Sequence, residues 1–218
     1  AGIIISASHN PKDYNALKFF DGNGEILSAK SVGEILKIAE DRDFNYSSVD
    51  NLGKVIYLDG MIERHVAKIL ELSLVNVNAI REKGYKVVVD AVNSTGGIAV
   101  PMLLDSLGVE VVKLYCEPTG LFPHNPEPLK EHLSVLSQHV IKEKADFGIV
   151  VDPDVDRLAF VDETGEMFGE EYTLVSCADY VLTHTPGNTV SNLSSTRALA
   201  DVTRSKGGQY FTSAVGEL

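Results

Sequence analysis

Three aspartates at alternate positions, Asp152, Asp154 and Asp156, follow an apolar run in the segment GIVVDPDVDRL. Carboxylates this close repel one another unless a cation neutralises them, and a hard divalent ion takes oxygen ligands. Arg157 comes next and could pair with one or two of the aspartates, but a single guanidinium does not easily satisfy three. We therefore expect this segment to bind a divalent metal ion.

Two other classes of site use a similar spacing of aspartates. An EF-hand loop that starts at Asp152 would have Glu163 at its last ligand position, but Arg157 occupies the position that requires glycine, and the flanking segments are typical of strands. In a phosphatase of the haloacid-dehalogenase type, Asp152 would be the nucleophile and Asp154 the acid/base. That alternative gives Asp156 and Arg157 no role, so it is the weaker hypothesis.

A second polar cluster follows the apolar start of the chain, in AGIIISASHNP. The run from Gly2 to Ile5 has the composition of a strand, and Ser8, His9 and Asn10 then form a loop closed by Pro11. Ligands commonly bind where a strand of an α/β sheet ends in such a loop. An ordinary turn, in which Ser8 and Asn10 bond only to nearby backbone, is the alternative, and these residues alone do not separate the two.

The pair of motifs SASHNP and DPDVDR, in this order, resembles the α-D-phosphohexomutase family, which includes phosphoglucomutases, phosphomannomutases and phosphoglucosamine mutases. The resemblance spans the whole chain and extends to the segment TSAVGE at residues 212–217. Ser6 stands where the common form of the motif has threonine, which keeps the hydroxyl. The resemblance implies that Ser8 carries a phosphate, and that Asp152, Asp154 and Asp156 bind Mg²⁺ together with a phosphoserine oxygen of Ser8.

The resemblance also implies roles for other residues and a reaction. Lys18 and Arg157 would compensate phosphoryl charge, with an exposed lysine and a structural ion pair as the alternatives, and His9 would be an acid/base candidate. The implied enzyme is an isomerase that interconverts hexose 6-phosphate and hexose 1-phosphate by phosphoryl transfer, through a bisphosphorylated sugar. Its partner would be a small-molecule sugar phosphate; a non-catalytic sugar-phosphate-binding domain is the other possibility.

Composition narrows the remaining classes of function. The chain has 218 residues and a net charge of −12, which argues against a general nucleic-acid surface. No apolar run approaches the roughly 18 residues that span a bilayer, so no membrane partner is expected. Cys116 and Cys177 lack the spacing of a zinc site or a disulfide scaffold, and we expect a cytoplasmic protein. Nothing in the sequence indicates an oligomeric state.

The surrounding pattern predicts an α/β fold with repeated mixed or parallel sheets flanked by helices. Two runs of apolar residues at β spacing, 2–5 and 17–20, precede a helix over 31–40. Further strands and helices then alternate. The strands are expected at 86–90, 109–115, 146–152, 158–162, 188–193 and 210–215. The helices are expected at 61–72, 78–83, 98–107, 170–184 and 194–207, with one more between the proline-rich segment 120–128 and the strand at 146.

This pattern predicts three units, with the first and third incomplete, because the chain starts in an apolar strand without elements that would cover it. The units are residues 1–47, with the serine loop; 48–165, with the aspartates; and 166–218. Within the third unit, Ser194, Ser195 and Thr196 are expected to cap the last helix. In the proline-rich segment GLFPHNPEP we expect His124 to be structural.

Overall fold

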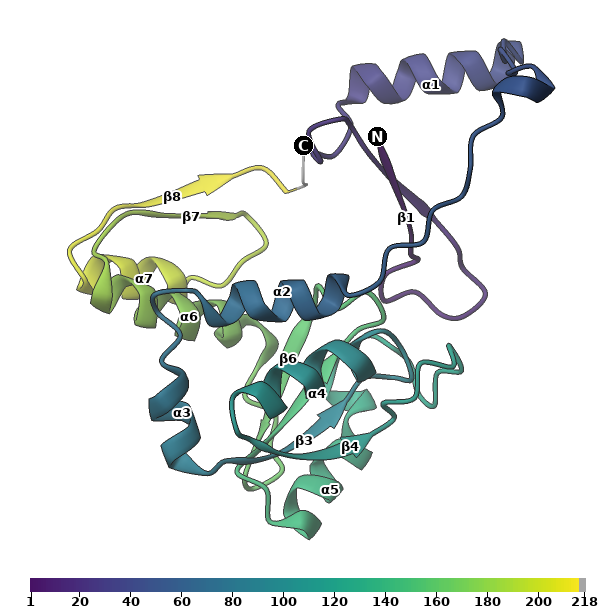
Figure 1. The fold of residues 1–218 in the computed structure, drawn as a ribbon. Helices are drawn as coiled ribbons and strands as arrows, with labels where there is room; N and C mark the ends of the chain where they lie inside the picture. Colours follow the sequence, from purple (N-terminus) through teal and green to yellow (C-terminus); the bar gives the residue numbers. More distant parts are fainter. Residues whose placement is uncertain (216–218) are drawn as a thin grey trace.

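A four-stranded mixed sheet lies at the centre of the computed structural model, which describes residues 1–215 (Figure 1). Its strand order is β4-β3-β5-β6, in which β3 pairs parallel with β4 and β5, and β6 pairs antiparallel with β5. The strands are β3 (Lys86–Asp90), β4 (Glu110–Leu114), β5 (Phe147–Val151) and β6 (Leu158–Asp162). The expected α/β fold with mixed and parallel sheets is therefore confirmed.

The valines of β3 explain how this sheet is covered on both faces. Successive side chains of a strand point to opposite faces, so Val88 and its neighbours Val87 and Val89 enter two different cores. The core around Val88 includes Leu136 and Val140 of α5 (Ser134–Glu143), and the core around Val87 and Val89 includes Leu104 of α4 (Gly96–Ser106). All three valines are fully buried, as expected for a central strand of a sheet between helices.

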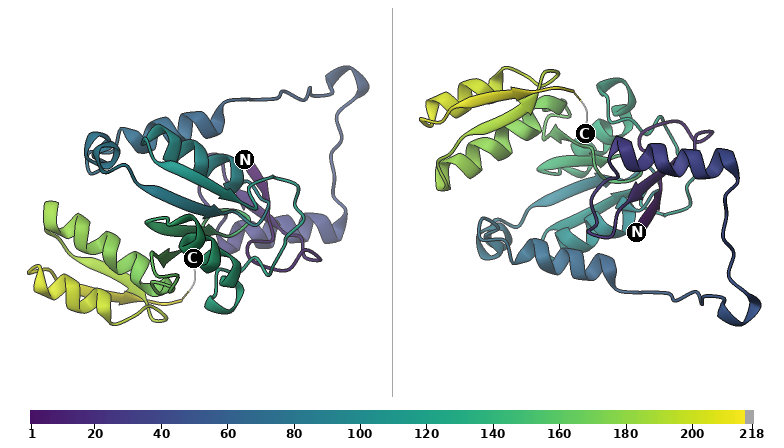
Figure 2. Two further views of the ribbon diagram at one scale, coloured as in Figure 1. Left: turned by 90° about the horizontal axis from the view of Figure 1, so that it is seen from below. Right: turned by 90° about the horizontal axis from the view of Figure 1, so that it is seen from above.

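Two smaller sheets flank the centre, as Figures 1 and 2 show. On one side β1 (Gly2–Ile5) and β2 (Leu17–Phe20) form an antiparallel pair, followed by α1 (Ala29–Asp41). On the other side β7 (Thr189–Asn192) and β8 (Tyr210–Ser213) pair in parallel. The remaining helices are α2 (Met61–Leu70), α3 (Val77–Lys83), α6 (Glu170–His184) and α7 (Ala198–Ser205), and short 3₁₀ turns lie at η1 (Val49–Asn51) and η2 (Lys130–His132).

One expected helix boundary is wrong. The helix predicted over 194–207 is α7 and begins only at Ala198. The side chain of Asn192 accepts hydrogen bonds from the backbone N–H of Ser194 and from the hydroxyls of Ser194 and Ser195, so these residues form a turn at the end of β7 instead of capping a helix. Thr196 accepts a bond from the N–H of Ala198 beside the helix start. Gly216 and Glu217 of the predicted TSAVGE segment lie outside the described residues.

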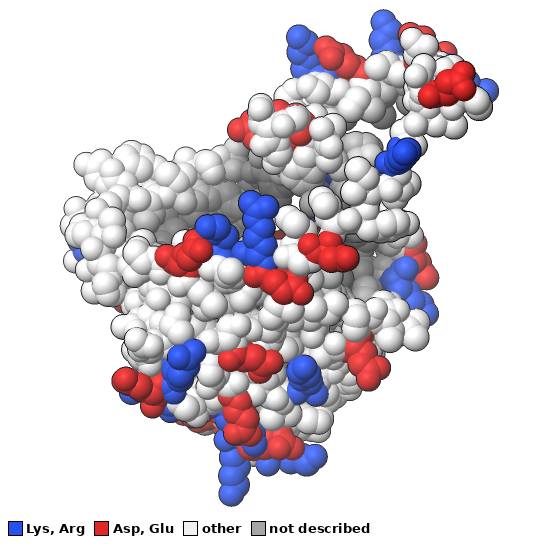
Figure 3. Space-filling view, viewed as in Figure 1, with Lys and Arg blue, Asp and Glu red and all other residues white. Residues whose placement is uncertain are grey.

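Charged side chains of both signs are interspersed on the face shown in Figure 3. We expected that the protein does not bind nucleic acid. The distribution of charge does not test this, so it stays a prediction. Among residues 1–215, no helix combines the length and the apolar character that crossing a membrane requires.

Candidate active site

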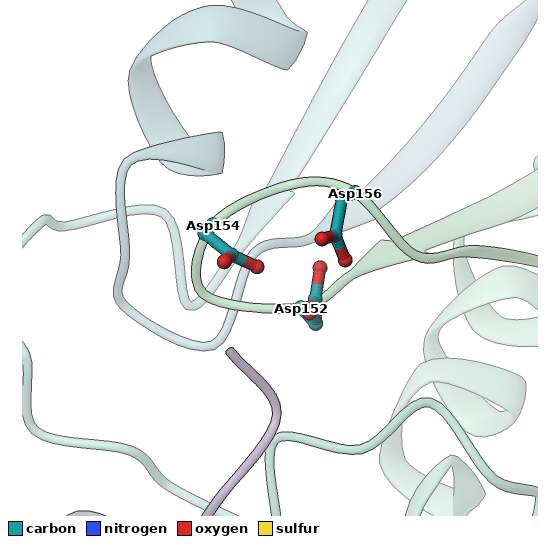
Figure 4. Close-up of side chains that lie close together, drawn as sticks. All are labelled: Asp152, Asp154 and Asp156. Atoms are coloured by element: carbon teal, nitrogen blue, oxygen red, sulfur yellow. The ribbon is translucent and has the colours of Figure 1, made fainter. Parts of the chain in front are cut away.

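The three aspartates lie in the loop that leaves the carboxyl end of β5, at the edge of the central sheet. Each offers a carboxylate oxygen within 4.8 Å of the others, and Figure 4 shows these side chains turned toward one another. The loop is tightly wound, because the N–H of Val155 bonds to the carbonyl of Asp152 and Val155 has a φ of 65°. A β-branched residue in this region of φ is strained, so the surrounding structure must hold the loop in place.

Asp152 is the buried member of the triad, with none of its surface exposed. Burial is the main reason that its pKa rises to about 6, and the charges of Asp154 and Asp156 raise it further, while a bond from the N–H of Arg157 lowers it. A carboxylate with a raised pKa is one whose charge is poorly compensated. A bound cation at this position would remove that cost.

Asp154 has the best protein partners of the three but also an unsatisfied atom. Its Oδ2 accepts a bond of 2.6 Å from the hydroxyl of Ser6 and one of 3.0 Å from Nζ of Lys18. Burial acts to raise its pKa, but these bonds outweigh that effect and hold the pKa below the ordinary value. Its Oδ1 is buried and has no hydrogen-bond partner among the described residues. Buried polar atoms normally have a partner, so Oδ1 fits the position of a metal ligand.

The serine loop, near the start of the sequence, lies beside the triad in the fold. The antiparallel pairing of β1 and β2 opens into residues 6–16, and the hydroxyl of Ser8 lies 3.5 Å from Oδ2 of Asp152. Ser8 has a φ of 52° and its N–H donates to Oγ of Ser6 at 2.9 Å. Nδ1 of His9 is 3.0 Å from the Ser8 hydroxyl. A strained serine whose hydroxyl meets a ring nitrogen and a carboxylate is placed for chemistry rather than for a simple turn.

Lys18 and Arg157, the two positively charged side chains predicted at the site, both lie there but have different partners. Nζ of Lys18 lies 3.0 Å from Asp154 and 3.6 Å from Asp156, and the Asp154 bond is the main reason that the pKa of Lys18 is raised. The guanidinium of Arg157 instead donates to Glu127 at 3.0 Å. With Glu127 the site holds four carboxylates against two cationic side chains, so two negative charges are in excess. That excess matches one divalent cation.

Two residues of the site were not predicted as functional. The hydroxyl of Ser6 links the serine loop to Asp154, which the sequence showed only as a change within the SASHNP motif. Glu127 lies in the proline-rich segment, and only the isolated acid between Pro126 and Pro128 could have drawn attention to it. His124 of the same segment pairs with the buried Asp90 at 2.9 Å, which is consistent with the structural role expected for it.

A cavity of about 570 Å³ opens beside the serine loop. It lies between that loop and the central unit, by which we mean the four-stranded sheet with α4 and α5. It is large enough for a small sugar derivative. Its lining includes Ser8, Lys12, Tyr14, Thr95, Phe122 and Asp154. Together with the triad, this cavity makes the meeting point of the two motifs a candidate active site.

Two family models match the chain. Residues 1–46 match domain I and residues 63–165 match domain II of the model described as phosphoglucomutase/phosphomannomutase, alpha/beta/alpha domain. The serine loop lies within the first match and the aspartate triad within the second.

Curated relatives and solved structures agree with these matches. The chain is 34% identical over its full length to a protein of Methanopyrus kandleri named "probable phosphoglucosamine mutase", and 33% identical to a "phosphoglucomutase/phosphomannomutase" of Thermococcus kodakarensis. It covers 47% of each, so it spans about half the length of the curated relatives it matches. A crystal structure of a phosphoglucomutase/phosphomannomutase family protein from Burkholderia thailandensis superposes with a TM-score of 0.83 at 29% identity, covering 98% of this chain and 45% of that one.

Proposed function

Because the chain belongs to the phosphoglucomutase/phosphomannomutase family, we propose that the protein is a phosphohexomutase that interconverts hexose 6-phosphate and hexose 1-phosphate. The observation that carries this proposal is the 3.5 Å contact between the Ser8 hydroxyl and Asp152, two residues separated by 144 positions in the sequence. Family membership also rules against the haloacid-dehalogenase hypothesis.

The residues present fit a Mg²⁺ ion. Oδ1 of Asp154, which has no hydrogen-bond partner among the described residues, the raised pKa of Asp152 and the excess negative charge all fit a bound cation. Asp152, Asp154 and Asp156 would hold the ion, with an oxygen of phosphorylated Ser8 as a further ligand. The bound ion would act as a Lewis acid that neutralises charge on the phosphoryl group.

The chain's own residues would support phosphoryl transfer as follows. The phosphate leaves Oγ of Ser8 for the free hydroxyl of the bound sugar phosphate, so the bond from phosphorus to Oγ breaks and a bond to the sugar oxygen forms. Lys18 compensates charge beside Asp154 and Asp156, and Arg157 offers further N–H donors to phosphoryl oxygens. His9 lies 3.0 Å from Oγ, where its ring can pass to this oxygen the proton that the sugar hydroxyl gives up.

The reaction is completed by a second transfer in the opposite sense. The bisphosphorylated sugar turns over in the cleft and returns its other phosphate to Oγ of Ser8. The proton that Oγ gives up passes through the His9 ring to the sugar oxygen that this phosphate leaves. The enzyme is then phosphorylated again, and the phosphate of the sugar has changed position. Charges held in a cleft of fixed geometry make such transfers efficient, since the main needs are positioning and electrostatic stabilisation.

The test uses the full-length protein. Peptide mass spectrometry measures phosphate on Ser8, and a mutase assay uses the 1-phosphates and 6-phosphates of glucose, mannose and glucosamine, the sugars in the names of the relatives. We expect Ser8→Ala to lose the phosphate and to reduce turnover at least a thousandfold, because the phosphoryl donor is gone. Ser47→Ala, at an exposed serine, is the control. Turnover that is unchanged in Ser8→Ala would exclude the proposal.

A further inference from the structure

Glu127 contacts two residues of the candidate active site from a segment that is distant from both in sequence. Its Oε1 accepts a bond of 3.0 Å from Nη1 of Arg157, and the same oxygen lies 4.0 Å from Nε2 of His9. His9 in turn meets the Ser8 hydroxyl, and the backbone N–H of Arg157 bonds to Asp152. One carboxylate thus links the serine loop to the aspartate loop.

The backbone around Glu127 is held firmly. Prolines on both sides, Pro126 and Pro128, are buried and restrict the backbone of this segment. The N–H of Glu127 bonds to Oδ1 of Asn125 at 3.0 Å, and its carbonyl meets Nδ1 of His132 at 2.8 Å. An acid on a flexible surface loop loses both side-chain and backbone conformational entropy when it forms an ion pair. In this segment the backbone is already ordered in the folded protein, so only the side chain is ordered by the pair.

The same segment is anchored to the central sheet. Nε2 of His124 meets Oδ2 of Asp90, which lies at the carboxyl end of β3 and is almost fully buried, while Nδ1 of His124 meets the carbonyl of Asn125. The ring of Tyr115, just after β4, packs edge-on against the His124 ring with centroids 5.8 Å apart. Glu127 is therefore carried by a segment whose position is fixed relative to β3 and β5.

We propose that Glu127 is a positioning residue that holds the Arg157 guanidinium ready for the transferring phosphoryl group; this inference rests on the proposed mutase function. Arg157 has five N–H donors, so one bond to Glu127 fixes the plane of the guanidinium and leaves others for phosphoryl oxygens. Without Glu127 the guanidinium would lose the partner that fixes its orientation.

The first arm of the test needs no turnover. Full-length wild type, Glu127→Gln and the control Glu131→Gln, which removes an exposed acid from the neighbouring η2 turn, are treated with phenylglyoxal, and modification of Arg157 is followed by peptide mass spectrometry. Removing the negative charge of the partner weakens its hold on the guanidinium, so we expect Arg157 to react several-fold faster in Glu127→Gln alone. Equal rates in all three proteins would overturn the inference.

The second arm asks whether the contact serves the reaction. We expect Glu127→Gln to lower kcat by roughly tenfold to a hundredfold, the usual cost of losing a residue that orients a functional group, with KM changed less than about twofold. In an Arg157→Ala background, Glu127→Gln should cost nothing further, because its partner is already absent. A loss that simply adds to that of Arg157→Ala would mean a structural role only.

Failure of the proposed function has its own signature. If the wild type has no mutase activity while Glu127→Gln still speeds modification of Arg157, the mutase proposal falls and Glu127 is left as a structural partner, which overturns the positioning role as well. If the wild type is active and Glu127→Gln is as active as wild type at an equal melting temperature, the positioning role alone is wrong. Glu131→Gln should match wild type in every measurement.

Discussion

Asp154 shows at the scale of one residue why this loop needs a cation. One oxygen is fully used by Ser6 and Lys18, and the other is buried with no hydrogen-bond partner among the described residues. The cost of an unsatisfied buried carboxylate oxygen is typically about 1–3 kcal/mol, which a metal ion would recover. Protein groups therefore satisfy Oδ2, and Oδ1 is placed to bind a metal ion.

We predict that millimolar Mg²⁺ raises the melting temperature of the 218-residue chain and that Asp154→Asn removes most of this rise. A ligand that binds only the folded state at a hundred times its Kd contributes about 2.7 kcal/mol of stability, so the shift is easily measured by differential scanning fluorimetry. Asp59→Asn, which removes the same charge at an exposed position, should keep the full rise. A wild-type chain that does not respond to Mg²⁺ would contradict the metal site.

His124 is one residue outside the aspartate triad through which stability depends on pH. Burial acts to lower its pKa, but the hydrogen bond and charge of Asp90 outweigh burial, so the pKa lies above its ordinary value of 6.5. The protonated ring therefore binds more strongly in the folded state than in the unfolded state. Its contribution is fully present below the ordinary pKa and is lost as the pH rises through the raised value.

We therefore expect the difference in free energy of unfolding between wild type and His124→Gln to be largest near pH 5.5 and to shrink by pH 9. Urea denaturation at a series of pH values measures it. His139→Gln is a comparison at a half-buried histidine whose ring meets a backbone carbonyl of its own helix rather than a carboxylate. A His124→Gln difference that grows toward pH 9 would show that the Asp90 pair does not stabilise the charged ring.

At the scale of elements, α4 packs unusually close to the end of β4. A Cβ added to Gly97, in the first turn of α4, would lie 2.2 Å from the backbone carbonyl oxygen of Cys116. Real Cβ atoms do not approach backbone this closely, so one of the two elements would have to move. Glycine at this position lets α4 cover the sheet near the ends of β3 and β4, beside the segment that carries Glu127.

We predict that Gly97→Ala destabilises the chain by roughly 1–3 kcal/mol, the usual cost of overpacking. Gly33→Ala is the matched control: it lies within the exposed helix α1 with open space at its Cβ, and alanine there should stabilise that helix by about 0.5–1 kcal/mol. Urea denaturation of the two variants and of wild type measures both effects. Equal stability of Gly97→Ala and wild type would mean that the close contact is relaxed at little cost.

At the scale of the whole molecule, the connection between α1 and α2 is the least protected part of the described chain. Apart from η1 it has no regular structure, and Figures 1 and 2 show it as an extended connection that stands away from the central sheet between α1 and α2. Val55, Ile56, Tyr57 and Leu58 are all exposed, and Tyr57 is 86% exposed. Segments without buried contacts open easily to a protease.

We expect brief chymotrypsin treatment of the 218-residue chain to cut first after Tyr46 or Tyr57. The central unit, with Tyr85 and Tyr115 packed in its two cores, should persist as a stable fragment on a gel and in intact mass spectrometry. The variant Tyr46→Ser/Tyr57→Ser should slow the first cut without changing the melting temperature. First cleavage after Tyr85 or Tyr115 would show that the central unit is not the stable core described here.

Local pattern was enough to predict most of the helices and strands and both motifs. Near-continuous apolar runs predicted the strands of the central sheet, which are buried on both faces, and helical spacing of apolar residues predicted most helices. The start of α7 was predicted too early, because the side chain of Asn192 accepts hydrogen bonds from Ser194 and Ser195 and holds them in a turn before the helix. The predicted unit boundaries at 47/48 and 165/166 stay predictions.

Which side chains meet at the site depends on the three-dimensional packing of these elements. The contacts from Ser8 to Asp152 and from Lys18 to Asp154 could be anticipated from the family resemblance, but not from spacing, because they depend on how β1 and β2 dock at the edge of the central sheet. Glu127 was missed altogether, since an acid between two prolines has no signature of its own. Arg157 was expected to pair with the neighbouring aspartates, but its guanidinium bonds to Glu127 in another loop. Local sequence pattern does not predict such a contact, because it depends on how distant segments pack together.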